Sequence, residues 1–256
     1  MAWTLISEFR AVYGIAIREV KRFFRARSRV FSSIFMPLFW LVIFGTGLGA
    51  SMKFSNSTFT NYTAFVFPGV IALNLFMRSI GAGVNILVDK QYGFMKEMLV
   101  APISRVSIVV GKVLGNSFTS LIQGCLILML AILFDISFPL INIPFIIFTM
   151  LLISAGFLGL GMMIATFFES VQGFQLMINL FVMPVFMLSG ALFPIDNLPS
   201  WLSLLTKLDP LTYGVDLLRY LILGVSFFNP VLDVLVVVGF TVFTVIIAAL
   251  AFNRRN

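Results

Sequence analysis

The sequence predicts an all-α integral membrane protein with six transmembrane helices. Of its 256 residues, 60% are hydrophobic and only 11% carry a charge, and the mean hydropathy is +1.08. A soluble domain of this length could not bury so much apolar surface. A helix needs about 20 apolar residues to cross the hydrocarbon, and six stretches are long enough. They cover residues 30–50, 62–87, 106–134, 143–167, 173–191 and 230–252.

The distribution of basic residues predicts the orientation of these spans. If the spans alternate, thirteen of the 17 lysines and arginines fall on one side of the membrane. Basic residues are enriched in cytoplasmic loops, so we expect a multi-pass protein of the cell membrane with both termini cytoplasmic. The positive charge is thus a topology signal in a lipid bilayer, and no nucleic acid partner is expected. The thirteen residues are Arg10, Arg18, Lys21, Arg22, Arg25, Arg27, Arg29, Lys90, Lys96, Arg105, Lys112, Arg254 and Arg255.

Composition excludes several kinds of chemistry. The chain has no histidine and a single cysteine, Cys125. Serine hydrolases of the Ser-His type and zinc proteases require histidine, and one cysteine forms neither a disulfide framework nor a cysteine metal site. We therefore expect no catalytic residues, no metal site and no cofactor on this chain.

Residues 1–29 predict an amphipathic helix ahead of the first span. Apolar residues recur at spacings of three and four from Leu5 to Phe23, and basic residues repeat on the opposite side. Such a helix is suited to lie along the cytoplasmic headgroups. It can act as a topology anchor only, or as a lever arm that also contacts a cytoplasmic partner. The residues of interest in this interface helix are Phe9, Arg18, Arg22 and Arg25.

A second amphipathic segment, at about residues 90–101, interrupts the apolar chain on the cytoplasmic side. Its apolar stripe at helical spacing lies between Gly93 and Pro102, and the proline should end the helix. The segment can lie on the lipid interface, or it can insert its apolar side chains into a groove of a soluble partner. The residues that would make this contact are Phe94, Met95, Glu97, Met98, Leu99 and Pro102.

The dipeptide Gly111-Lys112 invites comparison with a phosphate-binding loop. However, Val106 occupies the place of the first glycine, and Val113 stands where Ser or Thr must coordinate the metal. We expect no ATP binding by this route. Gly111 and Gly115 instead form a small-xxx-small pair, which predicts close packing of the third span against a neighbour.

Residues 192–229, between the last two spans, contain two apolar helical patterns at 198–208 and 211–223. Each is too short to cross the membrane. Backbone at membrane depth must be hydrogen-bonded within the protein, which a re-entrant helical hairpin in the outer leaflet achieves. A plain extracellular loop is the alternative. Asp216 and Arg219 are three residues apart and can pair on one helical face.

Two stretches resemble permeases of the type 2 ATP-binding cassette exporters. The run DKQYGFMKEMLVAPISRVSIVVGKVLG, which starts at Asp89, is similar to the coupling-helix region of that family. Residues 173–224 resemble the other half of its signature, and the likeness is closest to single-domain permeases of the drug-resistance and nodulation-factor export type. Asp209 stands where that family often has Asn. The matching positions are Ser189, Gly190, Phe193, Pro194, Leu198, Pro199, Trp201, Leu202, Pro210, Leu211, Thr212, Tyr213, Asp216 and Arg219.

The resemblance implies the permease subunit of an ATP-driven exporter that moves an amphipathic or lipid-linked substrate outward. It implies two permease copies, either identical or closely related, and two cassette ATPase subunits on separate chains that bind ATP and Mg²⁺. The segment at about 90–101 would be the coupling helix that contacts the ATPase, and the hairpin would close the exit of the path. The implied outer gate residues are Phe193, Pro194, Trp201, Pro210, Tyr213, Asp216 and Arg219.

Arg78 is the one clear ionisable residue well inside a predicted span. A charge in lipid is costly and is by default a functional-site hypothesis, here a residue that lines the substrate path. Alternatively, its long side chain reaches the headgroups or bonds to backbone carbonyls.

Other functions remain compatible to different degrees. An ion-coupled secondary transporter would keep carboxylates in the middle of its spans, whereas the sequence places its acids at interfaces and in loops. A membrane-bound transferase or hydrolase would need a cluster of acids or histidines at the interface. A non-transporting membrane scaffold is the third alternative.

Overall fold

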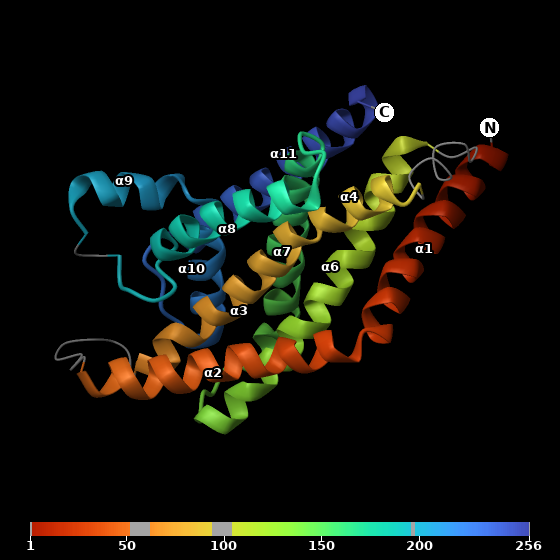
Figure 1. Ribbon diagram of the computed structural model, residues 1–256. Coiled ribbons are helices and arrows are strands. Elements are labelled where there is room, and N and C mark those ends of the chain that lie inside the picture. The colour runs from red at the N-terminus through yellow and green to blue at the C-terminus, as the bar shows by residue number, and fades with distance from the viewer. Residues whose placement is uncertain (1, 52–61, 94–103, 196–197, 256) are drawn as a thin grey trace.

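The computed structural model of the protein describes residues 2–51, 62–93, 104–195 and 198–255. Within these ranges every regular element is helical (Figure 1), in agreement with the predicted all-α membrane protein. The elements are α1 (Ala2–Arg25), α2 (Arg27–Ser51), α3 (Tyr62–Gly81), α4 (Gly83–Gln91), α6 (Arg105–Met129), η1 (Leu130–Phe134), η2 (Leu140–Asn142), α7 (Ile143–Ala165), α8 (Val171–Leu188), α9 (Ser200–Leu208), α10 (Pro210–Leu223) and α11 (Pro230–Arg255).

Among the described residues, five of the six predicted spans form helices long and apolar enough to cross a membrane. The first predicted span coincides with α2, whose described apolar stretch is Ile34–Gly45. That stretch is shorter than the roughly 20 residues a crossing requires, so the six-span arrangement stays a prediction. The five candidate spans are Tyr62–Asp89, Arg105–Phe134, Leu140–Ala165, Val171–Leu188 and Pro230–Ala251.

The second predicted span is interrupted near its cytoplasmic end. Helix α3 ends at Gly81 and α4 begins at Gly83, so the chain turns at Ala82. A Cβ on Gly83 would lie 2.5 Å from the carbonyl oxygen of Gly161 in α7. The turn therefore sits where two backbones touch, which only glycine permits.

Helix α7 lies at the centre of the bundle and packs against α3, α4, α6, α10 and α11. Its small residues bring neighbouring backbones close. A Cβ on Gly159 would lie 2.9 Å from the backbone of Thr244 in α11, and a Cβ on Gly161 would lie 2.5 Å from the oxygen of Ile80 in α3. Close approach through small residues is how helices associate without a hydrophobic driving force in lipid.

Helix α1 packs along the first half of α6. The contact uses the predicted small-xxx-small pair: a Cβ on Gly111 would lie 3.0 Å from the carbonyl oxygen of Val12, and a Cβ on Gly115 would lie 2.8 Å from that of Ala16. The interface helix is therefore attached to the bundle by protein contacts and is more than a helix lying on headgroups.

Replacing Gly115 by leucine is expected to push α1 away from α6. Overpacking of a close contact costs about 1–3 kcal/mol of unfolding free energy. Gly14→Leu is the matched control, because a Cβ at Gly14 meets nothing within 4 Å. Denaturant unfolding of the two purified variants in detergent checks this. An equal loss of unfolding free energy in Gly115→Leu and Gly14→Leu would contradict the close α1–α6 contact.

The region 198–223 forms two short helices, close to the predicted boundaries. Pro210 is the first residue of α10, and Asp209 caps it by accepting a hydrogen bond from the N–H of Leu211 at 3.0 Å. Helix α10 ends at Gly224, which has the left-handed φ of 73° typical of a helix C-cap. Every residue from Leu211 to Arg219 is buried, because α10 packs against α3, α7 and α11.

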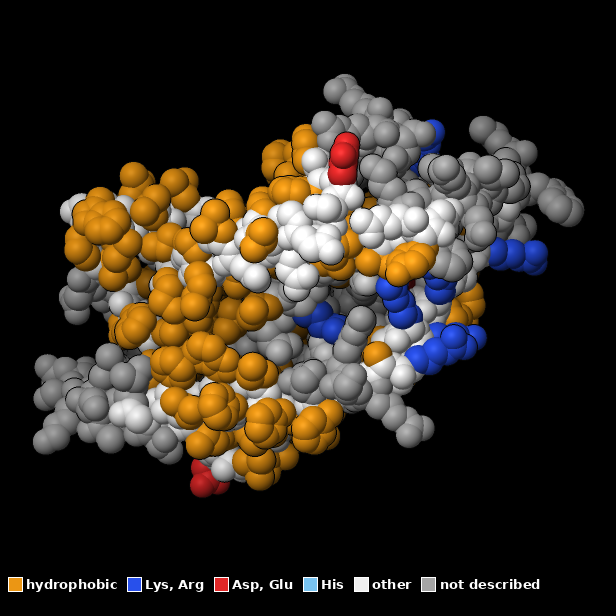
Figure 2. All heavy atoms as spheres, in the orientation of Figure 1, with side chains coloured by type: hydrophobic (Ala, Val, Ile, Leu, Met, Phe, Trp, Pro, Cys, Tyr) orange, Lys and Arg blue, Asp and Glu red, His pale blue; other side chains and the backbone are white. Residues whose placement is uncertain are grey.

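Basic side chains and hydrophobic side chains are distributed unequally between the two ends of the molecule. In Figure 1 both chain termini lie toward one end and α9 lies at the other. On the face drawn in Figure 2, lysine and arginine side chains gather near the end that carries the termini, and hydrophobic side chains cover most of the remainder. This division agrees with the asymmetry on which the predicted orientation rests.

Candidate functional site

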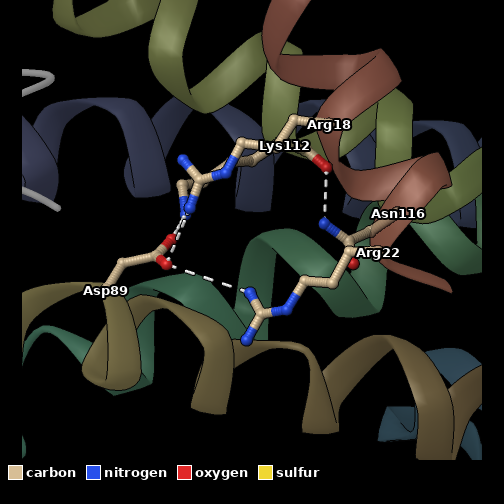
Figure 3. Close-up of polar contacts among 5 residues, drawn as sticks. All are labelled: Arg18, Arg22, Asp89, Lys112 and Asn116. Carbon is tan, nitrogen blue, oxygen red and sulfur yellow. Dashed lines mark hydrogen bonds and ion pairs between the residues drawn. The ribbon is translucent and has the colours of Figure 1, made fainter. Parts of the chain in front are cut away.

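A cluster of charges joins three helices beside the predicted coupling segment. Asp89 near the end of α4 accepts a hydrogen bond from Arg18 of α1 at 3.2 Å and forms an ion pair with Lys112 of α6. Arg22 of α1 lies 3.8 Å from the same carboxylate. Figure 3 shows the three cationic side chains converging on Asp89.

The Asp89–Lys112 pair is shielded from solvent. The side chain of Asp89 is 2% exposed and that of Lys112 is 3% exposed. Buried charges are tolerated only when they are paired, so each of these residues depends on the other. Next to them, Asn116 donates a hydrogen bond to the backbone oxygen of Lys112 at 2.9 Å. The cluster therefore fixes α4 against α6 and places the arginines of α1 over both.

A second contact holds α1 to the other end of the coupling segment. Ser104 is the N-cap of α6, and its backbone N–H donates to Glu8 of α1 at 2.8 Å. Its hydroxyl group donates to the same carboxylate at 2.9 Å. The described residues on the two sides of 94–103 are thus each bonded to α1, through Asp89 and through Ser104.

The Glu8 contact should be lost in acid. The hydroxyl of Ser107, followed by the groups of Ser104, lowers the pKa of Glu8 below its ordinary value of 4.5. Because the folded-state pKa is depressed, the contact is present above pH 4.5 and disappears as the pH falls through the lowered pKa. Hydrogen exchange of the Ser104 amide, corrected for its intrinsic rate, should accelerate there. Glu8→Gln should show fast exchange with little pH dependence.

The control is Glu169→Gln, which removes an exposed carboxylate from the turn between α7 and α8. This variant should retain the wild-type exchange profile at Ser104. A wild-type amide whose protection is unchanged below pH 4 would show that the Glu8 carboxylate does not hold it.

The predicted coupling residues lie outside the described part of the chain. This applies to Phe94, Met95, Glu97, Met98, Leu99 and Pro102. Their contact with an ATPase stays a prediction, and the structure describes only the two anchor points beside them.

The interface-helix residues are divided between two environments. Arg18 and Arg22 face Asp89, whereas Phe9 and Arg25 are exposed. The sequence grouped these four by helical spacing alone and did not identify the acid that separates them.

A second buried cluster lies between α10 and the start of α11. Arg219 is only 1% exposed, and one guanidinium nitrogen lies 3.6 Å from the carboxylate of Asp216. Its other terminal nitrogen donates to the carbonyl oxygen of Gly190 at 2.8 Å. The guanidinium also lies over the rings of Phe65 and Phe227, at 4.4 Å and 5.1 Å. The predicted pairing of Asp216 with Arg219 is confirmed.

Asp216 and a second acid share this cluster. The carboxylate of Asp216 accepts hydrogen bonds from the N–H groups of Phe227 and Phe228, both within 3.0 Å. Asp233 in the first turn of α11 is fully buried, and its oxygens accept no hydrogen bond from the described residues. Asp216 lies next to it. Two acids therefore oppose one arginine in the protein interior.

The remaining outer gate residues are spread over the surface of this region. Tyr213 is buried and donates its hydroxyl to the oxygen of Lys207 at 2.8 Å. Phe193 and Trp201 are exposed, and Pro194 and Pro210 are half-buried beside the hairpin. The structure does not bring these residues into one constriction, and their role as a gate stays a prediction.

Arg78 lies near the C-terminal end of α3, and its guanidinium is 4.6 Å from the centre of the Phe23 ring in α1. It faces a cavity between helices, together with Arg22. Among the described residues, no group of three or more acids or cysteines could hold a metal ion.

Sequence reasoning missed the importance of Asp89, Lys112 and the Glu8–Ser104 contact. One signal was available for Lys112. A lysine within an apolar stretch requires a counter-ion, and Asp89 at the end of the preceding span was one of the candidate acids near it along the chain. No pattern in the sequence indicates that Glu8 reaches Ser104, because the two are 96 residues apart.

These observations define a multi-pass helical membrane protein with an N-terminal helix bonded to the residues on both sides of 94–103. The chain belongs to the ABC-2 type transporter family, whose profile it matches over residues 10–223. It is a transmembrane permease of an ABC transporter, a family that works with a cassette ATPase.

Related proteins carry matching descriptions. A protein described as a transport permease, ycf38, from Cyanophora paradoxa is 30% identical over 79% of this chain and 72% of its own length. The inner membrane transport permease YadH of Escherichia coli is 26% identical over 93% of this chain and 91% of its own. YbhR of the same organism, described as a multidrug ABC transporter permease, is 26% identical over 64% and 45%.

Proposed function

We propose that this chain is the membrane subunit of an ATP-driven exporter whose nucleotide hydrolysis takes place on two separate cassette ATPase subunits. Those subunits, not this chain, bind ATP and Mg²⁺. The observation that supports the proposal is that described residues flanking 94–103 are bonded to α1 on both sides, Asp89 on one and Ser104 on the other. Movement of a docked ATPase would reach α1, α4 and α6 together.

In the proposed cycle, closure of the ATPases pushes on residues 94–103. Helices α1, α4 and α6 move as one rigid body because the Asp89 cluster joins them. Their displacement opens the region around α9 and α10 toward the outside. The cytoplasmic placement of both termini and the outward direction belong to this proposal, and the clustering of basic side chains at one end supports it.

Two permease copies are proposed to assemble through α8. The buried residues of α8 form one stripe, Phe174, Ile178, Val182 and Phe186. The rest of the helix leaves large apolar side chains exposed, among them Leu176, Leu180 and Met183. An identical copy, or a closely related permease, would cover this face.

The experiment is co-purification with a cassette ATPase from the same genome, followed by ATP hydrolysis measurements. Met98→Glu and Leu99→Asp should abolish retention of the ATPase. Ile141→Asp is the matched control, since Ile141 is an exposed apolar residue on η2, away from the segment. Retention of the ATPase by both coupling-segment variants would refute the proposed docking.

An ion-coupled carrier is the second candidate, because Asp216 and Asp233 are buried together. Such a carrier would accumulate substrate with the permease alone in vesicles, driven by a proton gradient. The exporter requires the ATPase and ATP. YbhR is described as a multidrug permease, so hydrophobic drugs are the first substrates to be tested in both arrangements.

A further inference from the structure

A polar cavity of about 290 Å³ opens between α1, α3, α4, α6 and α8 at the end of the molecule that carries the charge cluster. Two arginines line it, Arg22 and Arg78. Asn85, Asn116 and Gln175 add amide groups to the wall. This is a set of donors suited to a phosphate, which arginine binds through paired charge-assisted hydrogen bonds.

The charge around this cavity is positive on balance. Glu19 is the one acid in its described lining, against the two arginines. Arg22 also belongs to the Asp89 cluster, in which three cations, Arg18, Arg22 and Lys112, face one acid. A bound anion would therefore be attracted by the cavity wall and by the cluster next to it.

An apolar groove of about 400 Å³ continues from the polar cavity along α2, α3 and α8. Its walls include Trp40, Val70 and Phe186. Met77 lines both spaces, so the two hollows adjoin. The same helices supply both: Gln175 of α8 faces the cavity, and Asn179, one turn further on, faces the groove.

We propose that the cavity and the groove together bind an amphiphile whose phosphate-bearing headgroup has a net negative charge, with the headgroup against Arg22 and Arg78 and the apolar chain along Trp40. Both volumes are of the size of ordinary ligand sites, about 300–1,000 Å³. The inference rests on the proposed transport function in one respect: this site would be where the exporter takes up its substrate from the inner leaflet. Binding itself requires neither ATP nor the partner subunit.

The test uses the fluorescence of Trp40, which lines the groove. The other two tryptophans, Trp3 and Trp201, are replaced by phenylalanine. The purified permease is placed in phosphatidylcholine vesicles, and quenching is measured with brominated phosphatidylglycerol against brominated phosphatidylcholine of the same chains. Brominated phosphatidylglycerol should produce the same quenching at a mole fraction several-fold lower than brominated phosphatidylcholine. Arg78→Gln should reduce that preference on the order of tenfold, as expected for loss of a charge-assisted hydrogen bond.

Three variants separate this site from general surface attraction. Arg10→Gln removes an exposed arginine of α1 and should leave the preference unchanged. Arg78→Lys should retain part of it. Glu19→Gln should strengthen it, a direction that a loss of structure would not produce. Circular dichroism and thermal unfolding of each variant show whether the fold is intact.

Three results would overturn the inference. The first is equal quenching by the two lipids, and the second is an equal loss of preference in Arg10→Gln and Arg78→Gln. The third is displacement of brominated phosphatidylglycerol by inorganic phosphate as efficient as displacement by unbrominated phosphatidylglycerol, which would show an anion site without the groove. Because no ATPase is present, failure here leaves the proposed coupling untouched, and failure of ATPase docking leaves the binding result valid.

Discussion

Asp89→Asn is expected to lower the free energy of unfolding by about 3–5 kcal/mol, the cost of removing one partner of a buried ion pair. The variant keeps the shape of the side chain but removes the charge that compensates Lys112. Since Lys112 is 3% exposed, its ammonium group has no access to water as a substitute. Denaturant unfolding of the purified protein in detergent micelles, followed by far-ultraviolet circular dichroism, measures the loss.

A double-mutant cycle distinguishes a lost ion pair from a general disturbance of the bundle. Lys112→Met should be destabilising on its own, because it leaves Asp89 buried with only the partly exposed arginines of α1. The combination of Asp89→Asn with Lys112→Met should be more stable than the sum of the single effects predicts. Asp135→Asn, at an exposed turn, is the control and should change little. Additive effects would show that the two groups do not depend on each other.

The same variant has a functional consequence under the proposed mechanism. Without Asp89, one of the two contacts between α1 and the residues flanking 94–103 is lost, while Glu8 still holds Ser104. We expect ATP hydrolysis by the assembled complex to continue with transport reduced. That uncoupled behaviour differs from the effect of Met98→Glu, which should prevent assembly itself.

Hydrophobicity and helix-stop signals were sufficient to predict most of the fold. The long apolar stretches correspond to helices because lipid leaves a spanning backbone few alternatives. Pro210 and the glycine after α10 set the bounds of that helix through their backbone restrictions. The interruption at Ala82 was not predicted, because it arises from contact with Gly161, a residue of another helix.

The candidate site was predictable only where its residues are close in sequence. Asp216 and Arg219 could be paired from helical spacing. Asp233 could not be added to them, since its placement depends on how α11 packs against α10. In the same way, the sequence suggested that the basic face of α1 lies along the headgroups. Two of its arginines, Arg18 and Arg22, instead face Asp89, which is 71 residues from Arg18 in sequence. Long-range charge pairing has no periodic signature.

Arg219→Met is expected to be at least as damaging as the Asp89 substitution, at about 3–5 kcal/mol. It removes the donor to Gly190 and the only cation that the described residues place beside Asp216. Asp216 and Asp233 would then oppose each other in the interior without compensation. Arg219→Lys should recover part of the loss, since an ammonium group keeps the charge but cannot reach Gly190, Asp216 and the two phenylalanine rings at once.

Asp233→Asn provides the decisive comparison, because it predicts a change in the opposite direction. Asparagine replaces a carboxyl group that accepts no hydrogen bond from the described residues and lies next to Asp216, and the asparagine amide can donate a hydrogen bond to that carboxylate. The thermal stability of this variant should equal or exceed that of the wild type, and Asp233→Asn should rescue part of the Arg219→Met defect. Lys207→Met, on the exposed face of α9, is the control for loss of a positive charge in this region. Asp233→Asn could instead destabilise the protein as strongly as Arg219→Met. That result would show that the charge of Asp233 stabilises the folded state, and it would contradict a cluster in which two acids compete for one arginine.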